Sequence, residues 1–186
     1  MRKPILIVIN GRGGCGKDSL IQFAQKTMTN YKIRNESAID PIKQIMRDTL
    51  GWNGEKTDKD RAFMHNLKKL YSEYCNLPNK YLMSKFFLAW EDGDHIMFAH
   101  IREPEEIEDF KQIMQKKGTT PITLLVRRDN GNDHHYGNHA DDDVEKYNYD
   151  YVFQNNDDLN TTGQAFTQLL ESIIEKERPT WNDKNK

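Results

Sequence analysis

The sequence has few of the features that mark secreted, membrane-spanning or nucleic-acid-binding proteins. Its two cysteines, Cys15 and Cys75, form no disulfide or metal-binding pattern, so we expect a reducing cytoplasmic location. No apolar run approaches the length that spans a membrane, and residues 1–4 lead into a predicted strand rather than a signal peptide. The formal net charge of −2 gives no electrostatic footprint for a nucleic acid polymer.

The most informative stretch is a glycine-rich turn between a predicted strand and a predicted helix. Residues 11–17 fit the spacing G-x-x-x-x-G-K of a phosphate-binding loop, after an apolar run at residues 5–9 that is typical of a fully buried strand. Such a loop turns backbone amides toward a phosphate, whereas an ordinary tight turn would leave Lys17 a solvated charge. With strand and helix both in place, we predict phosphate binding by Gly11, Gly13, Gly14, Cys15, Gly16, Lys17, Asp18 and Ser19.

Asp18 departs from the general form of this loop, in which a serine or threonine follows the lysine and holds magnesium. Ser19 stands one place later, about 100° further round a helix, so it cannot simply replace the missing hydroxyl. A carboxylate is a hard oxygen ligand, and we predict that Asp18 binds Mg²⁺ directly or through water. The alternative is that Asp18 only complements the positive end of the helix.

Strands and helices alternate along most of the chain, which predicts one α/β domain over residues 1–186. Asp40 is expected to cap a helix that has Pro41 at its first position. Two consecutive helices between residues 58 and 91 interrupt the alternation and predict a lobe beside the sheet, at about residues 40–93. The predicted buried stripe of the first of these helices consists of Phe63, Leu67, Leu70 and Tyr74.

Basic residues follow two of the predicted strands. Arg102 and Glu103 come after the strand at 96–101, at the edge where open α/β sheets bind ligands. An arginine there suits a bidentate phosphate contact, and Glu103 is a candidate for holding a magnesium-bound water. The alternative is a surface ion pair at a helix start.

Arg127 and Arg128 stand at the root of a polar, glycine-bearing segment, which predicts a lid over residues 127–142. We expect residues 129–142 to be mobile without ligand and to order when both substrates bind. Because no cysteines accompany them, we assign no metal site to the lid histidines, which are His134, His135 and His139.

Taken in order, these motifs resemble the P-loop deoxynucleoside monophosphate kinases of phages and bacteria, within the adenylate-kinase-like group. The resemblance covers most of the chain. It rests on the G-K-D-S form of the loop, on residues 40–43 and 101–107, on Arg127, and on residues 149–152 before an asparagine turn. The loop is highly specific for phosphate, and the other pieces are short. His100 departs from many members, which have an aspartate two places before the arginine.

The resemblance implies a three-layer fold with a five-stranded parallel sheet, a monophosphate-binding lobe and a lid. It implies that the protein, as a monomer or homodimer, transfers the γ-phosphoryl group of ATP, with Mg²⁺, to a deoxynucleoside monophosphate. Lys17, Arg102, Arg127 and Arg128 would be catalytic, and Asn155 would join the loop in binding ATP. The acceptor would be bound by Asp40, Lys43, Arg61 and Arg102.

Two other classes of protein share the loop. Another small-molecule P-loop kinase, resembling phosphomevalonate kinase, can also read G-K-D, and its acceptor carries no base. A non-catalytic nucleotide-binding regulator would keep the loop but would not need the spread of basic residues. Those basic residues favour an enzyme.

Overall fold

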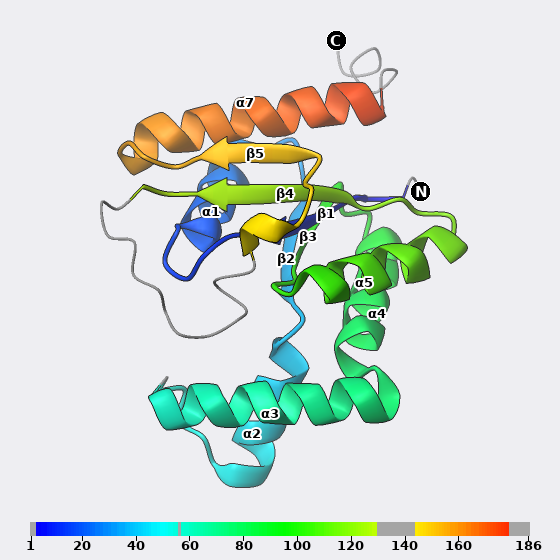
Figure 1. Cartoon of the computed structure of the whole chain (residues 1–186). Coiled ribbons are helices and arrows are strands. Elements are labelled where there is room, and N and C mark those ends of the chain that lie inside the picture. The colour runs from blue at the N-terminus through cyan, green and yellow to red at the C-terminus, as the bar shows by residue number, and fades with distance from the viewer. Residues whose placement is uncertain (1–2, 56, 130–143, 179–186) are drawn as a thin grey trace.

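The computed structural model describes residues 3–55, 57–129 and 144–178. Its centre is a five-stranded, all-parallel sheet in the order β2-β3-β1-β4-β5, which confirms the predicted α/β class (Figure 1). The strands are β1 (Ile5–Asn10), β2 (Ile33–Ser37), β3 (Ile96–His100), β4 (Ile122–Arg127) and β5 (Tyr151–Gln154).

Helices cover both faces of this sheet (Figure 1). The apolar residues of β1 at positions 5, 7 and 9 pack with α1 (Lys17–Thr27) and α7 (Leu159–Glu177). Those at positions 6 and 8 pack with α4 (Leu77–Glu91) and α5 (Pro104–Lys116) on the opposite face. Because successive strand side chains point to opposite faces, β1 is apolar from Ile5 to Ile9, and all six of its residues, including Asn10, are buried. The three-layer prediction is confirmed.

Two further helices, α2 (Asp40–Leu50) and α3 (Asp58–Cys75), lie beyond the end of β2 (Figure 1). They share a small core of their own, with Ile42, Met46 and Met64 at its centre. The predicted pair of helices between 58 and 91 is present, but α4 packs on the sheet while α3 stands apart from it with α2. A short 3₁₀ helix, η1 (Val144–Lys146), precedes β5. Among the described residues, no helix is both long and apolar enough to cross a membrane.

The buried face of α3 differs from the predicted one. Of the four predicted stripe residues, Phe63, Leu70 and Tyr74 are exposed by 43%, 62% and 88%. The fourth, Leu67, is partly buried and packs against the lobe core, as predicted. The buried residues are instead Met64, which faces α2, and Lys68, which pairs with two glutamates of the α5 region. The helical periodicity of the apolar residues was read correctly, but α3 is rotated by one residue from the predicted orientation. This rotation lets Lys68 form its ion pairs with the two glutamates.

Two helix starts also differ from their predicted positions. Helix α2 begins at Asp40 itself, whose carboxylate accepts a hydrogen bond from the Ser37 amide at 3.0 Å instead of capping the helix. For the last helix, Thr161 with Gln164 three residues later predicts a cap at Thr161. In the structure α7 is instead capped by Asp158, which accepts a hydrogen bond from the Thr161 amide at 3.2 Å. In both cases an aspartate within three residues of the start bonds a nearby backbone amide.

The exposed stripe on α3 makes a direct test of this packing possible. We expect Leu82→Ala to lower the free energy of unfolding by about 2–5 kcal/mol, because Leu82 is fully buried in α4. Leu70→Ala should cost less than about 0.5 kcal/mol, since that side chain lies largely in solvent. Urea denaturation measures both values. Equal losses would show that the Leu70 stripe is buried after all.

Candidate functional site

The glycine-rich loop joins the end of β1 to the start of α1 and packs closely against its neighbours. A Cβ atom at Gly11 would collide with the carbonyl oxygen of Val126 in β4, and one at Gly16 would collide with the side-chain amide of Asn155. Gly16 also has a φ of 90°, which L side chains rarely adopt. These two glycines are therefore required by close approach of the backbone as well as by the turn.

Asn155 supports the loop from the end of β5. Its Nδ2 donates to the Cys15 carbonyl at 2.7 Å, and its backbone amide donates to the Arg127 carbonyl at 2.7 Å. The residue is buried. The sequence predicted that Asn155 contacts ATP; in the structure it bonds to the backbone of the loop predicted to hold ATP.

Asn10, the last residue of β1, has a related role that the sequence analysis did not identify. Its Oδ1 accepts from the Gly11 amide at 2.8 Å, and its Nδ2 donates to the Arg102 carbonyl and to the Tyr149 hydroxyl, each at 2.7 Å. Burial raises the pKa of Tyr149 to about 12, and its neutral hydroxyl donates onward to the Val144 carbonyl. The sequence feature that could have identified Asn10 is a single polar residue at the end of an otherwise apolar strand.

Lys17 lies against the loop that precedes it. Its Nζ is 2.6 Å from the Gly11 carbonyl oxygen, 3.1 Å from that of Arg12 and 3.3 Å from the Cys15 sulfur. Cys15 itself is buried, as expected of a small residue that fills the loop. The ammonium group thus adds a full positive charge where the loop amides and the helix start are already electropositive.

Asp18 begins α1 with a largely exposed side chain, and Ser19 beside it is also exposed. The Asp18 Oδ1 accepts from the Asn35 Nδ2 at 3.2 Å, and the Asn35 Oδ1 lies 2.7 Å from the His100 Nε2. Burial lowers the pKa of His100 to about 4, so its imidazole is neutral at physiological pH. An accessible carboxylate next to Lys17 suits the predicted magnesium ligand.

Glu103, the other predicted magnesium residue, is bound to a lysine from α3. The Lys68 Nζ lies 2.7 Å from the Glu103 Oε2 and 2.5 Å from the Glu106 Oε2, and Lys68 is buried. Burial raises the pKa of Glu106, and its hydrogen bond to Glu103 raises it further. The pKa of Glu103 is lowered despite burial, because the hydrogen bond with Glu106 and the charge of Lys68 both stabilise its ionised form. The sequence analysis did not identify Lys68, because a lysine on an apolar helix face gives no local sign of its distant glutamate partners.

The two arginines at the lid root are placed differently. Arg127 ends β4 and forms a bidentate pair with Glu145, with the Nε at 2.9 Å and the Nη2 at 2.5 Å from its Oε2; these bonds raise the pKa of Arg127. Arg128 points to the loop, with one guanidinium nitrogen 4.0 Å from the Cβ position of Gly16. The remaining lid residues, 130–142, lie outside the described residues, as do the three lid histidines.

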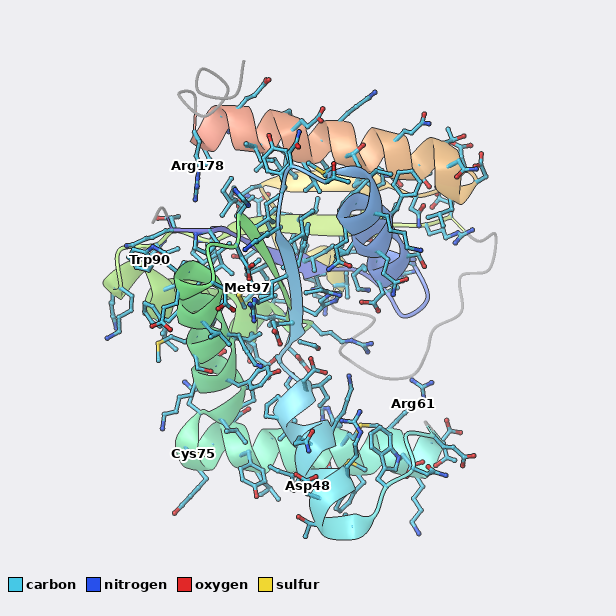
Figure 2. All side chains as sticks on the ribbon, turned by 180° about the vertical axis from the view of Figure 1, so that it is seen from behind. Asp48, Arg61, Cys75, Trp90, Met97 and Arg178 are labelled. Atoms are coloured by element: carbon cyan, nitrogen blue, oxygen red, sulfur yellow. The ribbon has the colours of Figure 1, made fainter. Side chains whose placement is uncertain are left out.

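The predicted acceptor residues come from the lobe and from the end of β3. Asp40 and Lys43 pair with each other at 2.8 Å, and their charges act on His100 together with those of Lys17 and Asp18. Arg61 stands at the end of α3 that lies on the same side of the molecule as the loop, with Cys75 at the far end (Figure 2). Because their charges act on His100, Asp40 and Lys43 lie near the carboxyl end of β3, which Arg102 follows.

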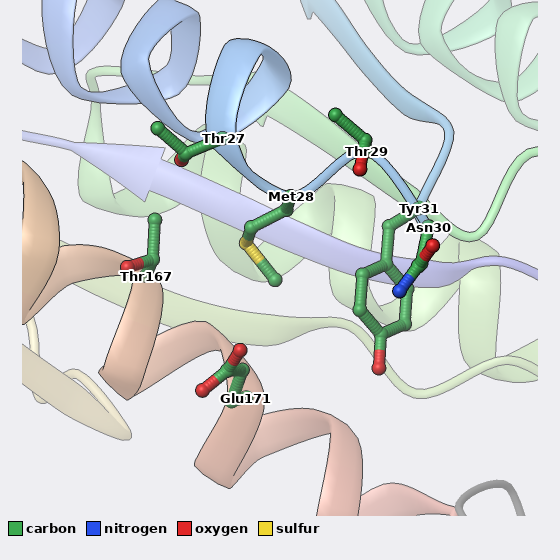
Figure 3. Close-up of a pocket in the computed structure, with 7 residues that line it drawn as sticks. All are labelled: Thr27, Met28, Thr29, Asn30, Tyr31, Thr167 and Glu171. Carbon is green, nitrogen blue, oxygen red and sulfur yellow. The ribbon is translucent and has the colours of Figure 1, made fainter. Parts of the chain in front are cut away.

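One cavity lies away from these residues, and a second borders them at Asp40. The first, of about 160 Å³, separates the end of α1 from α7 and is lined by residues that include Met28, Tyr31 and Glu171 (Figure 3). Because α1 begins at the loop, this cavity lies at the opposite end of the helix. The other, of about 580 Å³, lies between α2 and α4, with Arg47, Tyr81 and Lys85 in its wall.

Several solved structures of kinases share this fold. Two structures of the APS kinase of Mycobacterium tuberculosis, one in complex with AMPPNP and APS, align with TM-scores of 0.52 and 0.53 at 13% and 12% identity, covering 92% of this chain and 99% of theirs. The chain has the P-loop kinase fold. A proposed kinase from Chloroflexus aurantiacus aligns at 0.51 with 16% identity, over 92% and 98% of the chains.

These likenesses establish the P-loop kinase fold and reach no further than the fold. No protein-family model matches the sequence, and no curated protein sequence matches it. The finer resemblance, to the deoxynucleoside monophosphate kinases, rests on the sequence motifs alone.

The support that Asn155 gives the loop can be measured. We expect Asn155→Ala to lower the free energy of unfolding by about 1–3 kcal/mol, because it leaves the buried Cys15 carbonyl without its donor. ATP affinity should fall as well. The matched control is Asn156→Ala, which removes exposed bonds to Asp129 and should change both quantities little. Thermal unfolding and nucleotide titration give the values; equal effects of the two variants would refute the role of Asn155.

Proposed function

We propose that this protein is an ATP-dependent phosphotransferase that phosphorylates a nucleoside monophosphate, with a preference for deoxynucleotides. The observation that carries the proposal is the P-loop, with Lys17 folded over it and Arg128 beside Gly16, at the carboxyl edge of a P-loop kinase fold. The kinases of similar fold support a phosphotransferase. The nucleotide acceptor is supported by the sequence motifs in the lobe and after β3.

The reaction requires positioning and charge neutralisation rather than a covalent intermediate. An acceptor phosphate oxygen attacks the γ-phosphorus, the bond to the β–γ bridging oxygen breaks, and ADP leaves with that electron pair. A cation about 4 Å from a phosphate contributes about 4 kcal/mol at the effective dielectric of a protein surface. Lys17 and Arg128 are beside the loop already, and Arg127 would join them by exchanging Glu145 for phosphate.

Magnesium would be held by Asp18. When bound, the ion would neutralise charge on the β- and γ-phosphates and so ease departure of ADP. The residues present fit it, because Asp18 offers an exposed oxygen ligand at the first turn of α1. Glu103 fits less well, since its Oε2 is taken by Lys68.

The lobe would bind the acceptor. Lys43 on α2 would supply one cation, since its charge acts on His100 together with that of Lys17. Arg61 would supply a second from the end of α3 on the side of the loop (Figure 2), and Arg102 a third from the end of β3. Arginine guanidinium groups suit a phosphate monoester because they bind it in a bidentate manner. The second candidate is a small-molecule P-loop kinase whose acceptor is not a nucleotide, and it fits the same similar structures equally well.

The test is release of ADP from ATP and Mg²⁺ with each common nucleoside monophosphate in turn. We expect at least one deoxynucleotide to stimulate release well above ATP alone. Lys17→Ala should reduce turnover by roughly 10²–10³, the loss expected for one preorganised charge-stabilising group. Lys26→Ala, which changes an exposed lysine at the other end of α1, is the control and should be neutral.

Each outcome of the screen separates the candidates. Stimulation by 5-phosphomevalonate or a sugar but by no nucleotide would favour the second candidate. Nucleotide binding without release of ADP would identify a regulator. Unchanged turnover in Lys17→Ala would contradict a kinase that uses this loop.

The lid-root arginines should act on the transition state. Replacing both Arg127 and Arg128 by alanine should lower the turnover rate by about 10²-fold or more while changing the Michaelis constant for the acceptor much less. Arg127 has only a surface ion pair to lose, so folding should be retained. Steady-state kinetics decide: a rise in the Michaelis constant alone would place these arginines in ground-state binding.

A further inference from the structure

Asp18 is held in one orientation by two side chains that the proposed function does not use. Its Oδ1 accepts a hydrogen bond from the Asn35 Nδ2 at 3.2 Å. Among the described residues, no hydrogen bond to its Oδ2 is found, and the side chain is 73% exposed. One carboxylate oxygen is thus bonded to a residue of β2, while the side chain remains largely open to solvent.

The second link of this chain comes from β3. The His100 Nε2 lies 2.7 Å from the Asn35 Oδ1, in a side chain that is only 14% exposed. Parallel pairing places His100 opposite Ser37 of β2, so Asn35, two residues earlier, is its diagonal neighbour on the same face. The sheet register therefore fixes this contact.

The direction of the hydrogen bonds follows from the amide. The Asn35 nitrogen donates to the carboxylate, so its oxygen must accept, and the only available proton lies on the His100 Nε2. A nitrogen that carries this proton cannot coordinate a metal. The His100 Nε2 is also 3.6 Å from the Asp18 Oδ1, beyond a direct hydrogen bond.

We propose that Asn35 and His100 are positioning residues that orient Asp18 toward the magnesium ion of the bound nucleotide. A neutral amide in contact with Asp18 fixes the carboxylate without cancelling its charge, which remains available to the cation. Where a lysine or arginine made the same contact, the metal would have to compete with an ion pair. Residues behind a metal ligand commonly change metal affinity by 10- to 100-fold.

This inference rests on the proposed role of Asp18 in binding nucleotide-bound magnesium, so its test is built to read metal binding without turnover. Mn²⁺, a spectroscopic substitute for Mg²⁺, is titrated into the protein with the non-hydrolysable ATP analogue AMPPNP and followed by electron paramagnetic resonance. The variants are Asp18→Ala, Asn35→Leu, His100→Leu and His100→Gln. Circular dichroism confirms that each is folded, and binding of metal-free AMPPNP is measured for each.

We expect Asn35→Leu and His100→Leu to weaken Mn²⁺ binding about 10-fold or more and to leave the affinity for metal-free AMPPNP unchanged. His100→Gln should restore most of the loss, because its amide nitrogen can donate where the imidazole does. Adding Asn35→Leu to Asp18→Ala should cause no further loss, since both changes then act through one carboxylate.

Several results would overturn the proposal. One is unchanged Mn²⁺ affinity in Asn35→Leu while Asp18→Ala loses it. Another is full additivity of the two changes, and a third is failure of His100→Gln to recover, which would make the imidazole itself the ligand. If His100→Leu does not fold, Asn35→Leu and His100→Gln still decide. Absence of ADP release in the acceptor screen would count against the kinase assignment but would leave this metal measurement intact.

Discussion

The shape of the phosphate loop depends on hydrogen bonds from two buried asparagine side chains. Asn10 bonds the Gly11 amide at the start of the loop, and Asn155 bonds the Cys15 carbonyl near its end. Both side chains are almost fully buried, so an unmade bond would cost the full desolvation of a polar group. Through these two residues the loop is tied to the ends of β3 and β5, and its glycines can pack against backbone where no Cβ fits.

Lys68 links the lobe to the sheet in a comparable way, but burying its charge costs more desolvation energy than burying an asparagine amide. The lobe core contains few buried side chains, so apolar packing alone holds it weakly to the sheet. The buried ion pairs of Lys68 with Glu103 and Glu106 join α3 to the segment that follows Arg102. Removing one partner of such a cluster leaves an uncompensated charge, which makes the contact specific even where its net contribution to stability is small. The position of the lobe is thereby coupled to the region where the acceptor phosphate is proposed to bind.

The sequence predicted the features that depend on local pattern. The apolar run of β1 and the glycine spacing after it follow from short-range rules. So does the helix start at Pro104, which a proline followed by two glutamates predicts. The structure has all three. Thr57, directly before the first helix of the predicted pair, is a residue type that predicts a cap. The structure confirms this cap, and Asp60 completes it as a capping box by accepting a hydrogen bond from the Thr57 amide. The parallel sheet followed from the alternation of strands with helices.

The failures concern contacts between residues far apart in the chain. Periodicity placed Phe63, Leu70 and Tyr74 in a core, but the rotation of α3 depends on glutamates about 35 residues away, which no local rule locates. The role of Asn10 was not predicted, because its three partners belong to the loop, to the segment after β3 and to the segment before β5. Asn35 looked like one polar residue in a polar strand until the register brought it beside His100.

Three cations of the site already have partners within the protein itself. Lys17 bonds loop carbonyls, Lys43 bonds Asp40 and Arg127 bonds Glu145. These partners keep long basic side chains in place and limit their mutual repulsion, which lowers the ordering cost when a polyanion arrives. The phosphates must nevertheless displace them, so the net gain from each cation is the difference between two pairings and lies below its full Coulomb energy. That difference is largest where the first partner is a neutral carbonyl, and on this ground Lys17 should contribute more to nucleotide binding than either cation held by a carboxylate.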